Sequence, residues 1–337
     1  MNDEFTADRD PIAPEASETV MRIATGFMAS KYLFAGSELG LFEHLADGSL
    51  DLEVLAGRAG APVRTVRIVA DALVALGILE READKYRNAR AAQALLAGRR
   101  ESDLRPALRL FDRITYAAWM GLVRAVRTGE AVRAPIAPED QEILSQGIEA
   151  LSKPAATALA KSYDFAAHER LLDLGGGTGS FLEAVLRHHV RLSGTLMDVP
   201  VVAAIARERI AAAGLAGRSE VVGGDIFVHD IPLGHDVVLV ANVLHLMGPV
   251  RNRHLLRRVR QRIDEGGRLL LVDFFTDPTH TRPAFAALMA GSFLTGYGEG
   301  DVYSEAEVSG WLEETGWRNL GSQVLAGPAS LLIATTA

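Results

Sequence analysis

From residue 170 onward, short apolar runs of strand length alternate with amphipathic segments of helical length. This alternation predicts an α/β domain with a parallel, doubly wound, Rossmann-like sheet. The expected strands cover residues 171–174, 193–197, 219–222, 237–241 and 268–274. The expected helices between them cover residues 180–188, 201–213 and 250–263. Two last apolar runs, at 320–324 and 330–335, predict an antiparallel hairpin at the sheet edge.

The first half of the chain has a helical pattern instead. Between residues 18 and 46, apolar side chains cover more than one face of the expected helices. Such helices are buried or pair with another chain. Residues 49–92 predict two helices followed by a hairpin around a polar turn, which is the order of a winged helix. Residues 100–165 are helical again.

Three regions follow from these patterns. Residues 1–17 contain Pro, Asp, Glu and Ser without periodicity, which predicts a disordered tail. We expect an all-helical and winged-helix domain over residues 18–165. The α/β domain with its terminal hairpin should then cover residues 166–337.

A winged helix can bind DNA or serve as a packing and dimerisation module. The second helix of the segment carries Arg64 and Arg67, and DNA binding would place such a helix in the major groove. The formal net charge of the chain is −8, which argues against binding to nucleic acid or to anionic membranes. We therefore favour dimerisation and keep a DNA-binding regulator that senses a cofactor as a rival hypothesis.

Composition narrows the class of protein further. The 337 residues are 48% hydrophobic and 23% charged, as in ordinary globular proteins. No apolar run approaches the ~20 residues of a membrane span, and the acidic N-terminus has no signal-peptide pattern. The chain has no cysteine, which excludes disulfides, a thiolate nucleophile and Cys-ligated metal centres. We expect a cytoplasmic protein.

A glycine-rich turn, LLDLGGGTGS at 171–180, joins the first expected strand to a helix. Its glycines permit positive φ and close approach of a ligand, although a tight turn without a ligand is the alternative. Asp198 ends the second strand, where an acid can bind the two ribose hydroxyls of an adenosine. Asp225 follows the third strand and can accept a hydrogen bond from an adenine amino group. Phe227 can lie against that ring.

These residues suit either a nicotinamide dinucleotide or S-adenosylmethionine. Three observations favour S-adenosylmethionine. The G-x-G-x-x-G/A pattern begun at Gly175 ends at Ser180, a second acid is present at Asp225, and the motif lies in mid-chain after a large helical domain.

The ordered motifs LLDLGGGTG, GTLMDVP, GGDIF, VANVLH, GGRLLLVDFF and AGPASLLIA resemble a known family. It is the class I S-adenosylmethionine-dependent small-molecule O-methyltransferases, the caffeate, acetylserotonin and bacterial natural-product group. The stretch GSELGLFEHLADG, the winged-helix segment and residues 119–130 resemble that family's dimerisation domain. The resemblance covers about residues 18–337. It implies a homodimer that methylates a small aromatic or polyketide-like acceptor, with oxygen as the favoured atom.

The resemblance also implies roles for individual residues of the cofactor site. Gly175 and Gly177 would lie under the methionine end of the cofactor, and Asp198 would hold the ribose. Asp225 with Phe227 would frame the adenine. Asp173, before the loop, could receive amino groups of the loop or of the cofactor.

His245 matches the family's catalytic base, since imidazole can take the proton of a phenol as attack develops. Asp273 matches the first carboxylate that orients this histidine. Leu246-Met247 stand where the family has Asp-Trp, and Val302 stands at the second orienting carboxylate. These departures leave open a C-methyltransferase of the same fold and a relative that binds the cofactor without methylating.

Met289 and Phe293 lie in the region that matches the family's substrate-lining helix. No metal is expected. The iron used by some relatives needs an Asp after the catalytic histidine and a later His, whereas this chain has Leu246 and no histidine from residue 281 to residue 337.

Overall fold

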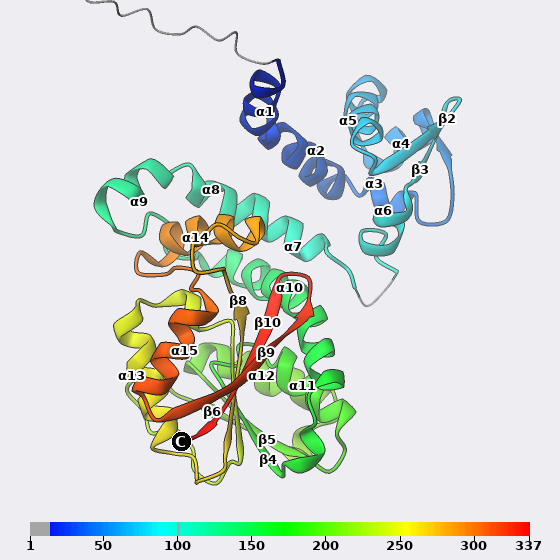
Figure 1. The fold of residues 1–337 in the computed structure, drawn as a ribbon. Coiled ribbons are helices and arrows are strands. Elements are labelled where there is room, and N and C mark those ends of the chain that lie inside the picture. Colours follow the sequence, from blue (N-terminus) through cyan, green and yellow to red (C-terminus); the bar gives the residue numbers. More distant parts are fainter. Residues whose placement is uncertain (1–13, 100–101) are drawn as a thin grey trace, which may run out of the picture. The chain divides into compact units, whose positions relative to one another are not determined.

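The computed structural model describes residues 14–99 and 102–337 (Figure 1). Contacts divide the chain into two compact units, Met1–Asp112 and Arg113–Ala337. This division falls earlier than the expected boundary after residue 165. The reason is that the helices of residues 116–162 pack on elements of the second unit, namely α14, α11 and β9.

The first unit is helical and contains one small sheet. Its antiparallel strands lie in the order β1-β3-β2. The core is formed by buried residues such as Phe42, Leu55, Leu73 and Tyr86. The elements are α1 (Pro14–Ala24), α2 (Gly26–Glu38), α3 (Leu41–His44), β1 (Leu50–Asp51), α4 (Leu52–Ala59), α5 (Val63–Ala75), β2 (Leu79–Glu82), β3 (Lys85–Asn88), α6 (Arg90–Leu95) and α7 (Arg105–Leu110).

The predicted helix, helix and hairpin of this unit are confirmed as α4, α5 and β2–β3. The predicted tail is wrong in part, because α1 begins at Pro14 and residues 14–17 form its first turn. The rest of that prediction, residues 1–13, lies outside the described residues.

The second unit begins with helices that precede the sheet. After a π-helical turn at Phe111–Thr115 come α8 (Tyr116–Trp119), α9 (Leu122–Thr128), α10 (Gln141–Ser162) and the 3-10 turn η3 (Phe165–Ala167). The long helix α10 packs on α11 and on strand β9.

The sheet of this unit alternates with helices as predicted. Its elements are β4 (Arg170–Leu174), α11 (Ser180–His188), β5 (Ser193–Asp198), α12 (Pro200–Ala212), β6 (Ser219–Gly223), β7 (Val237–Ala241), the 3-10 turn η5 (Leu244–Leu246), α13 (Pro249–Arg260), β8 (Arg268–Phe274), α14 (Ala284–Tyr297), α15 (Glu305–Glu314), β9 (Trp317–Ala326) and β10 (Ala329–Thr336).

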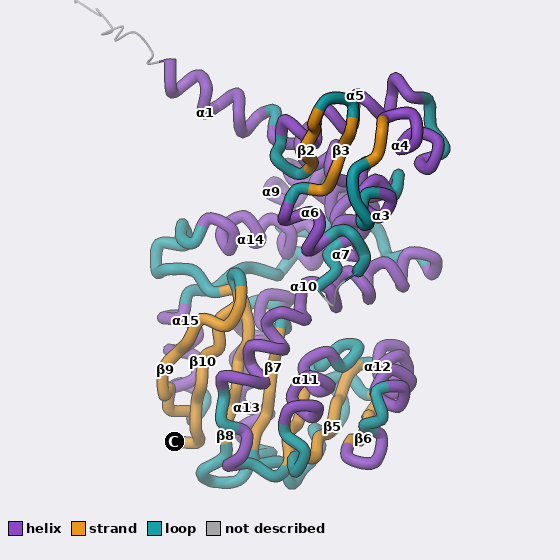
Figure 2. The backbone as a smooth tube through the Cα atoms, turned by 90° about the vertical axis from the view of Figure 1, so that its right-hand side faces the viewer, coloured by secondary structure: helices purple, strands orange, loops and turns teal. Residues whose placement is uncertain are grey.

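The seven strands lie in the order β6-β5-β4-β7-β8-β10-β9. Figure 2 shows β9 and β10 at one edge of this sheet and β6 at the other. Strands β4 to β8 are parallel, and β9–β10 form the predicted antiparallel hairpin at one edge. The strand order reverses between β4 and β7. Ligands of such sheets bind at this switch point, outside the carboxyl ends of the strands.

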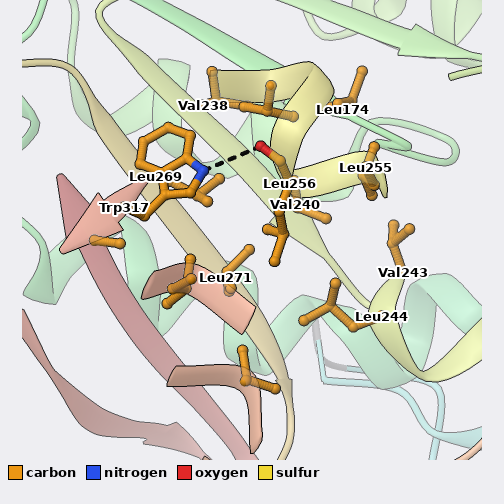
Figure 3. Packing of buried hydrophobic residues seen from close by; sticks show 14 of the residues in the cluster. Leu174, Val238, Val240, Val243, Leu244, Leu255, Leu256, Leu269, Leu271 and Trp317 are labelled. Atoms are coloured by element: carbon orange, nitrogen blue, oxygen red, sulfur yellow. Dashed lines mark hydrogen bonds between the residues drawn. The ribbon is translucent and has the colours of Figure 1, made fainter. Parts of the chain in front are cut away.

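Successive residues of a strand point to opposite faces of the sheet. Helices cover both faces, so the residues on each face are buried. Leu171 and Leu239 pack with α10, α11 and α12, whereas Leu172 and Val240 pack with α13 and α15. In the second layer Trp317 Nε1 donates a hydrogen bond to the carbonyl of Leu256 at 3.1 Å (Figure 3). Packing on both faces of the sheet holds in place the carboxyl ends of its parallel strands.

Candidate functional site

A cavity of about 510 Å³ lies at the switch point. Its walls are the loops after β4, β5, β6 and β7, together with one face of α10. This volume is in the range of pockets that take small ligands and cofactors. The predicted cofactor residues that line it are Gly175, Gly177, Asp198, Asp225 and Phe227.

The glycine-rich turn adopts a backbone that other residues would strain. Gly175, Gly177 and Gly179 have φ of 72°, 58° and 90°. A Cβ at Gly175 would lie 2.8 Å from the side chain of Val243, and one at Gly177 would meet open space. The turn therefore exposes its backbone to the cavity, as a ligand-binding loop requires.

Asp198 extends from the end of β5 into this cavity. Its Oδ2 accepts a hydrogen bond from the N–H of Gly177 at 2.8 Å, and its Oδ1 accepts one from Val199 at 2.7 Å. Each oxygen keeps lone pairs for further donors. Burial raises the pKa of this carboxyl above its ordinary value. The arrangement suits a pair of ribose hydroxyls.

At the far end of the cavity, Asp225 Oδ1 accepts the N–H of Phe227 at 2.7 Å. The guanidinium of Arg251 lies 4.5 Å from the centroid of the Phe227 ring, and Arg251 also lines the cavity. The sequence prediction missed Arg251, which reaches this place because α13 packs behind the loop after β6.

Asp173 is fully buried and does not line the cavity. It lies beneath the loop, since a Cβ at Gly176 would be 2.7 Å from its carboxyl group. Among the described residues, no donor forms a hydrogen bond of good geometry with either carboxyl oxygen. Burial raises the pKa of Asp173 to about 7. The geometry thus places Asp173 directly beneath the loop.

A second group of predicted residues meets beside the cavity. His245 lies on η5, directly after β7, and Asp273 lies near the end of the neighbouring strand β8. His245 Nδ1 and Asp273 Oδ1 are 2.6 Å apart, and both side chains are buried. Oδ1 also accepts the N–H of Phe274 at 2.8 Å. The Nε2 atom of His245 has no hydrogen-bond partner among the described residues. It is therefore the ring nitrogen that is available to a bound ligand.

A second carboxylate does not reach His245 in the part of the chain that the structure describes. Val302 is fully buried in an apolar cluster with Ala286 and Phe293. The carboxylate of Asp301 accepts the N–H of Val302 at 2.7 Å, while the N–H of Asp301 donates to the carbonyl of His245 at 3.1 Å.

The two expected substrate residues lie at this histidine, on α14. The ring of Phe293 stacks on the imidazole of His245, and Met289 packs, partly buried, against the cluster that contains Phe293. Neither residue lines the cavity of the switch point.

Sequence reasoning did not connect α10 to the site. Ser152 and Glu149 of this helix line the cavity, and Ser152 Oγ accepts a hydrogen bond from Asn242 Nδ2 at 3.3 Å. Asn242 lies after β7 with a left-handed φ of 58°, which is uncommon for a non-glycine residue. An amphipathic pattern identifies a buried helix face but not the element that covers it.

Within residues 14–99 and 102–337, no group of three or more His, Asp or Glu side chains is placed to hold a metal ion. In the same residues, no helix is long and apolar enough to cross a bilayer.

Comparisons with known proteins agree with this geometry. A family model of the O-methyltransferase domain matches residues 132–318, and a model of the O-methyltransferase dimerisation domain matches residues 21–98. The chain is 34% identical to 3-hydroxy-5-methyl-1-naphthoate 3-O-methyltransferase of Streptomyces sahachiroi, over 91% of each chain. It is 31% identical to the tetracenomycin polyketide synthesis 8-O-methyl transferase TcmO of Streptomyces glaucescens, over 93% of this chain and 95% of that protein.

Among solved structures, that of the mitomycin 7-O-methyltransferase MmcR is similar with a TM-score of 0.81 at 30% identity. The match covers 96% of this chain and 98% of MmcR. The glycine cradle and the free lone pairs of Asp198 fit the backbone contacts and ribose of an adenosine cofactor. The chain therefore belongs to the S-adenosylmethionine-dependent O-methyltransferase family and is a methyltransferase that uses this cofactor.

Proposed function

We propose that this enzyme methylates a hydroxyl oxygen of a small aromatic or polyketide-like acceptor, with His245 as the general base. The observation that carries the proposal is the 2.6 Å contact between His245 Nδ1 and Asp273 Oδ1, on the turn that borders the cofactor cavity. Leu246 and Met247, the two residues after His245, line that cavity, so the base is adjacent in sequence to the cofactor site.

We infer a separate task for each residue of this pair. Asp273 accepts the Nδ1–H of His245, which fixes the tautomer and leaves Nε2 as the basic atom. Nε2 takes the proton of the acceptor hydroxyl as the oxygen attacks, and Asp273 stabilises the imidazolium that forms. When bound, S-adenosylmethionine supplies the electrophilic methyl group. Burial of the pair keeps water from the proton that moves.

The acceptor class rests on the relatives. The proteins from Streptomyces sahachiroi and Streptomyces glaucescens are named as methyltransferases of a hydroxynaphthoate and of a polyketide. Around His245, the apolar residues Phe293, Met289 and Phe274 favour an acceptor whose reacting part is a flat aromatic ring.

A nitrogen acceptor is a second candidate, because the chain is also 32% identical to the N,N-dimethyltransferase OxyT of Streptomyces rimosus, over 80% of its length. The two alternatives raised by the sequence, methylation of carbon and cofactor binding without methylation, still apply. The chemical shift of a transferred ¹³C-methyl group separates oxygen, nitrogen and carbon products.

The proposal is tested with 3-hydroxy-5-methyl-1-naphthoate as probe. Wild type should form an O-methyl product, and His245→Gln should lower kcat by about 10²-fold or more. The Kd of S-adenosylhomocysteine should stay unchanged, because His245 does not line the cavity. Equal turnover in wild type and His245→Gln would contradict the assignment of the base.

We also infer that the enzyme is a homodimer whose first unit contains a winged helix used for dimerisation. The matched dimerisation model and the order α4, α5, β2–β3 support this inference. Arg67 of α5 pairs with Asp71 at 2.9 Å, which leaves less free positive charge for a DNA backbone. The absence of a nucleic-acid or membrane partner, and a cytoplasmic location, remain predictions.

A further inference from the structure

The ring of Phe293 lies face to face on the imidazole of His245. The two ring centroids are 3.9 Å apart and the planes differ by 18°. Phe293 comes from α14 and His245 from η5, and these two elements pack together. Both side chains are buried. The imidazole is therefore held at its Nδ1 edge by Asp273 and over one face by Phe293.

A third ring is nearly parallel to these two. The Phe274 centroid is 5.8 Å from that of His245 and 6.4 Å from that of Phe293, with interplanar angles of 23° and 17°. These distances place Phe274 beside the pair rather than on the opposite face of the imidazole. Phe274 follows Asp273 on β8, so one strand supplies both the hydrogen bond and the lateral ring.

Residues 300–302, after α14, pack closely against both His245 and Phe293. A Cβ at Gly300 would lie 2.6 Å from the carbonyl oxygen of His245 and 2.9 Å from Cβ of Phe293. The next residue, Asp301, donates its N–H to the same carbonyl at 3.1 Å. Buried Val302 then packs in the cluster that contains Phe293. The backbone of His245 and the ring of Phe293 are thus fixed by one short segment.

We propose that Phe293 is a positioning residue for His245, and that this aromatic face takes the place of a second polar partner on the imidazole. The inference rests on the proposed role of His245 as base. A single hydrogen bond at Nδ1 leaves the imidazole able to tilt about that bond. The stacked ring opposes the tilt and keeps Nε2 directed at the acceptor, and such alignment governs the rate of transfer.

Histidine NMR tests the contact without an acceptor. In wild type, the ring current of Phe293 should shift the His245 ring protons upfield, with their signals identified by their loss in His245→Gln. Phe293→Leu should remove this shift, whereas Phe293→Tyr, which keeps a ring, should retain it. Equal His245 shifts in wild type and Phe293→Leu would overturn the proposal, whatever the acceptor proves to be.

A double-mutant cycle tests whether Phe293 acts through His245. With 3-hydroxy-5-methyl-1-naphthoate and radiolabelled cofactor, Phe293→Leu should lower kcat by about tenfold or more and Phe293→Tyr should restore most of it. In the His245→Gln background, Phe293→Leu should cause little further loss. Losses that multiply would mean that Phe293 acts on the acceptor itself, and would overturn the positioning role.

Two further variants keep the test decisive if Phe293→Leu does not fold. A Cβ at residue 300 is too close to both the His245 carbonyl and Phe293 Cβ, so Gly300→Ala should displace the stacked pair, move the His245 signals and lower kcat. Gly310→Ala, on α15 with no atom within 4 Å of the added Cβ, is its control and should change neither. Unmoved His245 signals in Gly300→Ala would contradict the stack. Failure of the proposed function would appear differently, as unchanged turnover in His245→Gln.

Discussion

At the scale of residues, the site depends on carboxylates whose surroundings differ. Asp198 has one backbone N–H on each oxygen and faces the cavity, whereas Asp173 is enclosed below the loop. Asp273 has the imidazole of His245 on one of its oxygens. The three carboxylates lie toward the carboxyl ends of β4, β5 and β8 but should respond differently to substitution.

Asp198→Ala should weaken binding of S-adenosylhomocysteine by more than tenfold, because the ribose would lose two charge-assisted hydrogen bonds. Calorimetric titration measures the change. Asp264→Asn, whose carboxyl lies at the other end of the sheet, is the control and should bind like wild type. Unchanged affinity in Asp198→Ala would remove this residue from the ribose site.

Asp173 should make folding stability depend on pH. Because burial raises the pKa of Asp173 to about 7 in the folded state, the folded protein binds a proton more tightly than the unfolded chain. The stability from this group is present below about pH 4 and is lost as the pH rises to about 7. Thermal unfolding of wild type and Asp173→Asn from pH 5 to pH 8 should show a smaller decline in the variant. A parallel decline would show that Asp173 is ionised throughout.

At the scale of elements, an ion-pair network joins the cavity wall to the glycine-rich loop. Arg209 of α12 pairs with Glu149 of α10 and with Glu183 of α11, the latter at 3.2 Å. Its guanidinium also donates to Thr178 Oγ1 of the loop at 3.2 Å. Three helices and the loop therefore share one half-buried arginine.

Arg209→Gln should lower the Tm by a few degrees and weaken S-adenosylhomocysteine binding, because Glu149 and Glu183, both partly buried, each lose an ion pair. The matched control is Arg187→Gln. It removes an exposed partner of the same Glu183, and should change little. Equal effects of the two substitutions on ligand affinity would show that the network does not support the loop.

Most of the α/β elements could be predicted from the sequence, because apolar runs indicate the strands and glycine-rich turns indicate where they end. Helix α11, for instance, has the predicted limits of residues 180 and 188. The roles of Arg251, Ser152 and Asn242 could not be predicted. These residues lie on helices and turns that reach the site through tertiary packing. The periodicity of a sequence does not show which elements pack together.

At the scale of the whole molecule, the first unit presents an apolar surface on α1 and α2. Ile23 is 70% exposed and Phe27 is 50% exposed, and both lie within the matched dimerisation segment. Exposed apolar residues in such a group indicate a surface that a protein partner covers.

We expect sedimentation to give twice the mass of one chain for wild type, and one chain for the double variant Ile23→Glu/Phe27→Glu. Charged side chains would have to be buried in the proposed dimer contact. Val324→Glu, at an exposed residue of β9 outside the dimerisation segment, should leave the dimer intact. A monomeric wild type at micromolar concentration would refute the homodimer.

O-methylation with His245 as base is tested by ¹³C NMR of the product made from S-adenosylmethionine labelled in its methyl group. Wild type and His245→Gln would each be incubated with 3-hydroxy-5-methyl-1-naphthoate after both are shown to bind S-adenosylhomocysteine equally. We expect a methoxy signal from wild type and about 10²-fold less of it from His245→Gln. A methyl signal on carbon, or a methoxy signal of equal rate in the two proteins, would contradict this expectation.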